Sequence, residues 1–219
     1  MIAETTDYLS LLGRMLPGAT VGYTNVSWDE YEALLAEMGD DWPGRRVSYY
    51  HGKLEIAMPL PEHEEYKDFI FRLANVLAEE LEIDLETRGG ATWRRRKKVS
   101  GVEPDTCFYV QNAAHAIGRR EFDLEHDLPP DVAVEIDKTH PSTQKFPIYA
   151  GLGVAEIWRY DGRRVTFYEL QGGAYQRISH SRAFPVLASH IVTQFLEQSK
   201  TDGQSAALRA FRCWLREQS

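Results

Sequence analysis

The stretch from residue 131 to residue 160, DVAVEIDKTHPSTQKFPIYAGLGVAEIWRY, decides the fold. It begins with a mostly apolar run over residues 131–136, which is typical of a strand buried on both faces. Residues 143–152 then predict a helix that ends before Gly153, and residues 155–160 predict a second strand. A strand, a helix and a strand in this order indicate a domain that mixes helices with a partly parallel sheet.

Two helices are predicted on the N-terminal side of this stretch. Residues 62–82 carry apolar side chains at intervals of three and four, among them Phe69, Ile70 and Leu73, and their first turn is acidic. Ser27 followed by Glu30 three residues later forms a capping box, which predicts a helix over residues 28–38. Both helices therefore have a defined start and an apolar face.

The remaining segments are mostly strands. Residues 46–50 and 53–58 flank His51 and Gly52, which suit a tight hairpin turn. Further strands are expected at residues 83–87, 91–96, 105–110, 164–170 and 175–178, with an irregular polar segment over residues 111–128. The order of elements predicts an α/β (α+β) fold with a central mixed β-sheet flanked by helices, the longest of them on one face.

The length of 219 residues fits one domain with additions. We expect an N-terminal arm over residues 1–26, a globular domain over residues 27–198, and a linker and C-terminal helix over residues 199–219. The linker is expected near residues 200–204, after a helix over residues 186–198. The final helix carries Phe211 and Trp214 on an apolar face, which needs cover from the domain or from a second copy of the chain.

The composition excludes several classes of protein. Hydrophobic residues make up 43% and charged residues 26%, which is ordinary for a globular domain. Two cysteines cannot form a disulfide framework, and no Cys/His cluster suggests zinc. We expect no signal peptide and no membrane span, and hence a cytoplasmic protein. The net charge of -8 counts against a protein that coats nucleic acid non-specifically. The chain lacks a GxSxG motif, so a Ser/His/Asp hydrolase is poorly supported.

Three carboxylates are candidates for chemistry. Glu135 lies near the end of the apolar strand, where burying an unpaired carboxylate would cost several kcal/mol. It therefore needs a partner, which is a metal, a lysine or arginine, or a set of backbone donors. Asp137 shares a strand face with Glu135, and Asp105 opens an earlier strand after Pro104. Carboxylates on neighbouring strands can hold Mg²⁺ (or Mn²⁺), which activates water and stabilises charge on a phosphate.

A lysine near the metal would complete that chemistry by positioning the water and balancing the charge on the phosphoryl group. Lys138 follows the strand but points to the face opposite Glu135 if the strand continues. Lys145 lies near the start of the following helix, which is expected to pack beside the end of the strand. We therefore favour Lys145 as the catalytic lysine.

The sequence resembles the Uma-type restriction endonucleases of the PD-(D/E)xK nuclease superfamily. The resemblance covers roughly residues 27–196. It rests on the segments YYHGKLE (residues 49–55), PEH (61–63), PD (104–105), VEI (134–136) and KFPIYAGLGVAEIWRYD (145–161), of which the last is the most specific. It implies a restriction-endonuclease-like core that cleaves phosphodiester bonds of DNA with a bound metal.

The resemblance also implies roles for individual residues. Asp105 and Glu135 match the two metal carboxylates, and Lys145 matches the lysine that begins the Lys-x-x-x-Tyr helix of the family. Glu62 matches an acidic position that often adds a metal contact. One departure is that Asp137 stands where the simplest pattern of the superfamily has a lysine, two residues after the glutamate. Asp137 and His63 are further candidates, as a third ligand and as a functional histidine.

Two hypotheses remain open from the sequence. The first is a Mg²⁺-dependent DNA endonuclease, for which a homodimer would suit double-strand cleavage. The second is a non-catalytic module that keeps the nuclease fold to bind nucleic acid or a protein partner, which the acidic net charge and Asp137 favour. The basic run Arg94, Arg95, Arg96 and Lys97 is either a phosphate-contacting edge beside the site or a solvated strand and loop.

Overall fold

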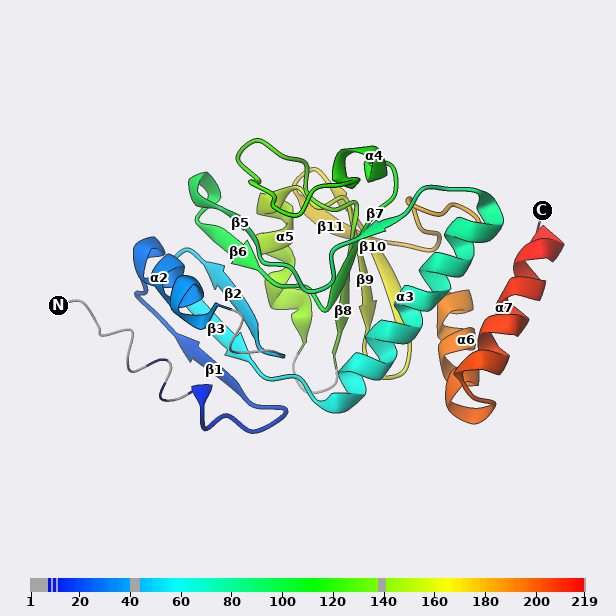
Figure 1. The fold of residues 1–219 in the computed structure, drawn as a ribbon, viewed down its shortest axis with the longest axis horizontal. Helices are drawn as coiled ribbons and strands as arrows, with labels where there is room; N and C mark the ends of the chain where they lie inside the picture. The colour runs from blue at the N-terminus through cyan, green and yellow to red at the C-terminus, as the bar shows by residue number, and fades with distance from the viewer. Residues whose placement is uncertain (1–7, 9, 11, 40–43, 138–140, 219) are drawn as a thin grey trace.

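The strands form two sheets, with helices on the outside of each and one helix between them (Figure 1). The structure, a computed structural model, describes residues 8, 10, 12–39, 44–137 and 141–218. The central mixed sheet expected from the sequence is the larger of the two, and the other sheet is purely antiparallel.

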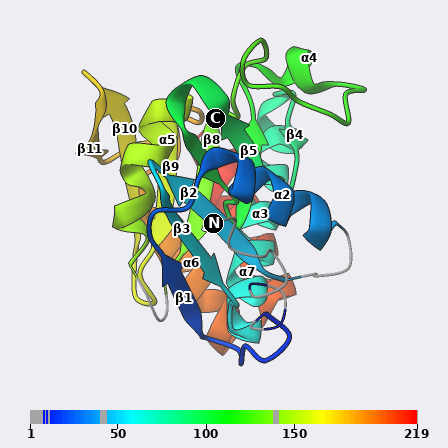
Figure 2. The ribbon, with the colours of Figure 1, turned by 90° about the vertical axis from the view of Figure 1, so that its left-hand side faces the viewer.

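The smaller sheet has the strand order β1-β3-β2-β6-β5, and every neighbouring pair is antiparallel. Its strands are β1 (Thr20–Tyr23), β2 (Arg46–Tyr50), β3 (Lys53–Ala57), β5 (Trp93–Arg95) and β6 (Ser100–Val102). Seen from the side of the N-terminus, this sheet lies in front of the rest of the molecule, with α2 (Trp28–Met38) against its outer face (Figure 2).

The larger sheet has the order β11-β10-β9-β8-β7-β4. Its strands are β4 (Glu86–Thr87), β7 (Thr106–Tyr109), β8 (Val132–Ile136), β9 (Glu156–Tyr160), β10 (Val165–Gln171) and β11 (Ala174–Ile178). Only β8 and β9 are parallel, and the other pairs are antiparallel. The parallel pair brings the C-terminal ends of β8 and β9 to the same edge of the sheet, next to the smaller sheet.

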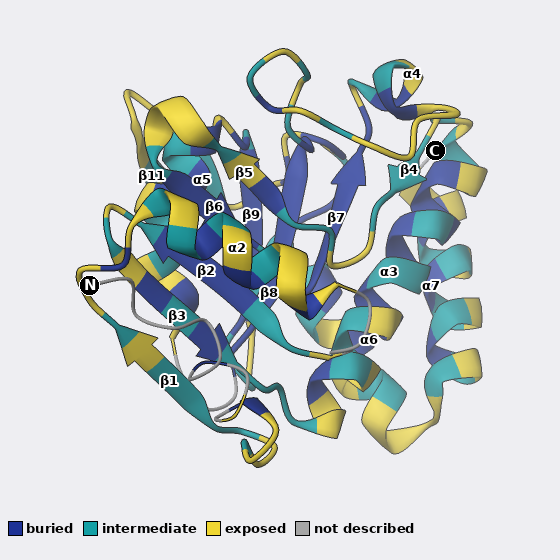
Figure 3. Cartoon of the chain, turned by 60° about the vertical axis from the view of Figure 1, so that its left-hand side comes forward, coloured by how far each residue is buried: buried dark blue, intermediate teal, exposed yellow. Residues whose placement is uncertain are grey.

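The remaining helices cover the larger sheet on both faces. They are α3 (Pro61–Leu81), α4 (Ala113–Ala116), α5 (Phe146–Leu152), α6 (Ser189–Thr201) and α7 (Gln204–Gln218), with 3₁₀ turns η1 (Arg96–Lys98) and η2 (Ser142–Lys145). Helices α3, α6 and α7 pack on one face, and α5 lies between the sheets. Figure 3 shows buried residues along α3. Phe69, Ile70 and Leu73 of this helix are fully buried, which stabilises the fold by about 1.5–3 kcal/mol for each side chain.

Several sequence predictions are confirmed. The hydroxyl of Ser27 accepts the backbone N–H of Glu30 at 3.2 Å, and Glu30 Oε2 accepts the backbone N–H of Ser27 at 2.6 Å, so the capping box forms. His51 and Gly52 both adopt positive φ, at 45° and 83°, and turn β2 into β3. The helix expected over residues 143–152 starts as the 3₁₀ turn η2, because the ring of Pro147 is incompatible with a regular helix before it.

The chain passes from the smaller sheet to the larger sheet at Pro104. This explains why the strands form two sheets where the sequence predicted one. The backbone N–H of Glu103 donates to Val47 in the smaller sheet at 3.1 Å, and that of Asp105 donates to Val134 in the larger sheet at 3.1 Å. Pro104 between them has no N–H and cannot continue either ladder. The strands expected at residues 83–87 and 91–96 are shorter than predicted, and β6 in residues 99–104 was missed.

The two ends of the chain belong to the packed structure. Residues 20–23, expected in the N-terminal arm, form the edge strand β1 beside β3. Only Asp202 and Gly203 separate α6 from α7, where the sequence predicted a linker near residues 200–204. Helix α7 returns onto α3 and α6, so its apolar face is covered within the chain. No helix in the described part of the chain is long and apolar enough to cross a membrane.

Candidate active site

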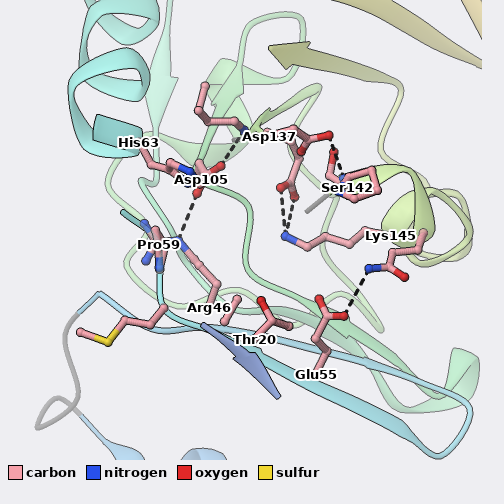
Figure 4. A pocket seen from close by; sticks show the side chains of 15 residues that line it. Thr20, Arg46, Glu55, Pro59, His63, Asp105, Asp137, Ser142 and Lys145 are labelled. Carbon is pink, nitrogen blue, oxygen red and sulfur yellow. Dashed lines mark hydrogen bonds and ion pairs between the residues drawn. The ribbon is translucent and has the colours of Figure 1, made fainter. Parts of the chain in front are cut away.

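A small cleft lies where β8 ends, between the two sheets and the first turn of α3 (Figure 4). Its volume is about 60 Å³. Five residues singled out from the sequence line it together, although they come from four separate segments: His63, Asp105, Glu135, Asp137 and Lys145. The fold therefore brings most of the sequence-predicted site into one place.

Asp105 is held against the backbone of β8. Its carboxylate is buried, and Oδ2 accepts the backbone N–H of Ile136 at 2.7 Å. The other oxygen, Oδ1, lies 3.6 Å from Nε of Arg46, which enters the cleft from the start of β2 (Figure 4). The hydrogen bond from the N–H of Ile136 keeps the carboxylate of Asp105 close to that of Glu135, the residue before Ile136.

Glu135 is only 2% exposed and accepts three hydrogen bonds from side chains of the following turn and helix. Nζ of Lys145 donates to its two oxygens at 2.9 and 3.2 Å, and the hydroxyl of Tyr149 donates to Oε1. Burial raises the pKa of Glu135 to about 7, although Lys145 acts in the opposite direction. The carboxylate is therefore paired, but the positive charge around it does not fully offset its burial.

Lys145 reaches Glu135 because η2 turns the chain back over the end of β8. It is the last residue of η2 and the N-cap of α5, four residues before Tyr149, so both side chains lie on the same face of the chain. Burial alone would lower the pKa of Lys145, but the charges of Glu135 and Asp105 outweigh it and raise this pKa. Lys145 is consequently a cation in this cleft. The alternative lysine of the sequence analysis, Lys138, lies outside the described residues.

Asp137 lines the cleft but is engaged by other groups. Its Oδ2 accepts the backbone N–H of Ser142 at 2.9 Å and Nε of Arg159 at 2.5 Å. These bonds attach the start of η2 to the end of β8. Where the superfamily pattern would have a lysine, this chain has a carboxylate that holds the turn carrying Lys145.

Two other buried carboxylates show what a purely structural acid looks like in this fold. Asp131 accepts the backbone N–H groups of Val110 and Asn112 at 2.7 and 2.9 Å. Glu156 accepts those of Arg182 and Ala183 at 2.8 and 3.0 Å. Backbone N–H groups, together with the neutral side chains of Asn112 and Trp158, satisfy these acids. Glu135, in contrast, depends on the side chains of a lysine and a tyrosine that line or approach a cleft.

The donor set of the cleft fits a divalent cation. Carboxylate oxygens are the ligands that Mg²⁺ prefers, and Mg²⁺ commonly takes one or two of them and completes its shell with water and phosphate oxygens. Asp105 and Glu135 supply two such groups. Within the described residues, no three His, Cys, Asp or Glu side chains converge as a metal cluster, so the protein would supply two carboxylates here and no closed cage. Burial raises the pKa of Glu135 in spite of Lys145, and a cation bound beside this carboxylate would favour its charged form.

Comparison with known proteins assigns the chain to a family. A family model described as "Putative restriction endonuclease", Uma2, matches residues 28–198, which is more than half of the chain. The chain belongs to the Uma2 family. Its fold is similar to that of a protein from Anabaena variabilis described as a putative nuclease belonging to DUF820, with a TM-score of 0.50 and 16% identity over 68% of this chain and 90% of that chain. A search of curated proteins found none that matches the chain.

The Uma2 resemblance assigned a metal contact to Glu62, and the structure does not bring this residue to the others. Glu62 is exposed on the first turn of α3 and does not line the cleft, whereas its neighbour His63 is buried and does. The cleft therefore combines Asp105, Glu135 and Lys145 without Glu62.

The basic run lies at the other end of the smaller sheet from the cleft. Arg95 is opposite Ser100, which is opposite Tyr50, while the cleft is lined by Arg46 at the start of the same strand. Four residues of strand separate these positions by roughly 13 Å. The run is also paired with acidic side chains: Arg94 with Glu32, Arg96 with Asp29, and Lys97 with Glu125. This arrangement agrees with a solvated strand and loop more than with an edge beside the site.

Arg46, Tyr149 and Glu55 are the site residues that sequence reasoning missed or left undecided. Tyr149, the tyrosine of the Lys-x-x-x-Tyr helix, is buried, and its hydroxyl donates to Oε1 of Glu135. Glu55 of β3 lines the far wall, 3.3 Å from the amide of Gln144. Arg46 is separated from Asp105 by 59 positions, so only the need of a buried carboxylate for a cation could have indicated it.

Proposed function

We propose that the chain is a metal-dependent DNA endonuclease, with Asp105 and Glu135 holding Mg²⁺ (or Mn²⁺). The observation that carries this proposal is the meeting of these two carboxylates with Lys145 in one cleft, from three segments of the chain. Membership of a family of restriction endonucleases supports DNA as the substrate. A metal bound there would lower the pKa of a coordinated water and offset negative charge on the phosphate.

The side chains around the carboxylates have distinct parts in this proposal. Lys145 keeps its proton, because Glu135 and Asp105 raise its pKa, so it donates to a water or phosphate oxygen and balances charge; it does not act as the base. Tyr149 fixes the carboxylate of Glu135 by donating to Oε1. Arg46 forms an ion pair with Asp105, at 3.6 Å, and adds a second positive charge at the wall of the cleft.

Plasmid cleavage tests the proposal. The intact chain should nick or cut supercoiled DNA with Mg²⁺ or Mn²⁺ and not with EDTA. Asp105→Asn keeps an acceptor for the backbone N–H of Ile136 but removes the charge, and it should slow cleavage more than about 100-fold while the melting temperature stays close to that of the parent. Asp84→Ala, a change at an exposed acid outside the cleft, is the control and should cleave normally. Equal rates for Asp105→Asn and the parent would contradict the assignment.

The alternative function is a non-catalytic module that binds nucleic acid or a protein partner. The ion pairs favour it, because Glu135 and Asp105 each already have a cationic partner, Lys145 and Arg46, without a metal. Calorimetric titration with Mn²⁺ distinguishes the two functions when it is combined with the cleavage assay. Metal binding without cleavage would favour the module, and no metal binding would exclude the proposed metal site.

A homodimer is the remaining part of the proposal, because cutting both strands of a duplex calls for two sites. Helix α7 does not supply the interface, since its apolar face is covered by α3 and α6. We therefore expect pairing to depend on DNA. Light scattering after size exclusion, with and without a duplex, measures the mass in each case, and products that are nicked but not linear would indicate a single active site per complex.

A further inference from the structure

The turn between β9 and β10, residues 161–164, lies directly beside the cleft. Strands β8 and β9 are parallel and in register at Ile136 and Tyr160, so they end together. The backbone N–H of Asp137 donates to the carbonyl of Tyr160 at 2.7 Å. A Cβ atom built on Gly162 would lie 3.8 Å from the carbonyl oxygen of Asp137, which lines the cleft. Any polymer that extends from the cleft on this side passes over the turn.

The turn is held in one conformation by its own hydrogen bonds. Oδ1 of Asp161 accepts the backbone N–H groups of Arg163 and Arg164 at 3.0 and 2.9 Å, and its own N–H donates to the carbonyl of Arg164 at 3.1 Å. Gly162 has φ of 88°, a left-handed value that glycine adopts without strain. The two arginines therefore start from fixed backbone positions.

The side chains of these arginines are available to a partner. Arg163 is exposed, and it makes no ion pair or side-chain hydrogen bond with the described residues. Arg164 is 64% exposed, and its one side-chain contact within the described residues is the 3.5 Å from Nε to Asp161 Oδ2. In contrast, Arg159 of β9 pairs with Asp137. An anionic partner would meet two cations here without first breaking a strong pair.

The first two turns of α3 also border the cleft: His63 lines it, and the ring of Tyr66 packs against Tyr160 at the end of β9. The first two turns of α3 carry Glu62, Glu64, Glu65 and Asp68, and the side chains of Glu64 and Asp68 are 45% and 66% exposed. Lys67 and Arg46 both pair with Glu64 and offset part of this charge. A chain of phosphates is therefore repelled by the acidic side chains of α3 and attracted by the two arginines of the β9–β10 turn.

We propose that nucleic acid leaves the cleft over the β9–β10 turn, with Arg163 and Arg164 each contacting a backbone phosphate. The inference rests on the proposed function, and it assigns the phosphate-binding face to this turn in place of the basic run at residues 94–97. Arginine suits the role because its planar donors match the oxygens of a phosphate. Such contacts fix the register of the nucleic acid and carry no base specificity.

Fluorescence anisotropy with a labelled DNA duplex tests this proposal, with Ca²⁺ in place of Mg²⁺ so that binding is measured without turnover. The double variant Arg163→Ala/Arg164→Ala should bind at least about fivefold more weakly, and the slope of log K against log salt should fall by about 2. The control is Arg177→Ala/Arg209→Ala, which removes two exposed arginines from β11 and α7 and should keep the slope of the parent. The variant Arg94→Ala/Arg96→Ala tests in the same way whether the basic run at residues 94–97 contacts the DNA.

Each outcome decides between distinct ideas. A reduced slope in the Arg163/Arg164 variant alone supports the proposal. An unchanged slope there, or the same reduction in the Arg94/Arg96 variant or in the control, overturns it while the proposed function stands. If the chain binds DNA but does not cleave it in Mg²⁺, the proposed catalytic function is wrong and the proposed phosphate-binding face stands. If the intact chain does not bind DNA, both the proposed function and the proposed phosphate-binding face are wrong.

Discussion

Burial and pairing act on Glu135 in opposite directions, and burial prevails. The pKa of its carboxyl rises from 4.5 to about 7 because the group is enclosed, in spite of Lys145 and the hydroxyl of Tyr149. Between about pH 4.5 and pH 7, this carboxyl therefore binds more protons in the folded state than in the unfolded state. Stability without metal therefore falls as the pH rises from about 4.5 to about 7, by an amount on the order of 1–3 kcal/mol.

Glu135→Gln should remove this dependence, because glutamine does not titrate. Chemical unfolding in EDTA at a series of pH values measures the free energy, and its slope between pH 5 and pH 7 should flatten in the variant. Glu37→Gln, on the exposed face of α2, should retain the slope of the parent. Saturating Mg²⁺ should also reduce the slope of the parent, because the ion binds only the deprotonated carboxylate. A slope shared by all three proteins would place the titration on another group.

At the scale of elements, η2 decides whether the lysine reaches the carboxylates. Asp137 attaches the first residue of η2 through the N–H of Ser142, and Lys145 is the last residue of the same turn. Asp137→Ala should release this attachment and lower kcat about ten- to a hundredfold with little change in KM, as outer contacts of metal sites do. Asp137→Asn keeps an acceptor for Ser142 and should restore most of the rate. Equal losses in both variants would mean that the charge of Asp137 acts directly, as a third ligand would.

Local patterns predicted the elements whose cause is local. The capping box of Ser27 and Glu30 and the apolar stripe of α3 are properties of consecutive residues, and both helices form close to their predicted bounds. Strands β1 and β6 have four and three residues, and each depends on partners elsewhere in the chain, so no local pattern marks them. The pair of Arg46 with Asp105 has the same origin. The pair of Lys145 with Glu135 was anticipated because the next helix was expected to return to the end of β8.

At the scale of the whole molecule, α7 completes the core although it follows the segment matched by the family model. Phe211 is fully buried between Phe195 of α6 and Trp214, and Arg212 and Arg216 pair with Glu80 of α3. The sequence left open whether this apolar face serves the domain or a second copy. In the structure this face packs within the chain. Packing within the chain and packing against a second copy predict different effects of a single substitution.

Phe211→Ala should destabilise the chain by about 3–5 kcal/mol, since it removes a large buried side chain and leaves a cavity between α6 and α7. Denaturant unfolding measures this loss, and light scattering should give the same mass for the variant and the parent. Cys213→Ser, on the exposed side of the same helix, should change neither stability nor mass. If α7 instead joined two copies, Phe211→Ala would lower the mass, and the melting temperature of the parent would rise with protein concentration. A concentration-independent melt together with a large loss in the variant would assign α7 to the fold of one chain.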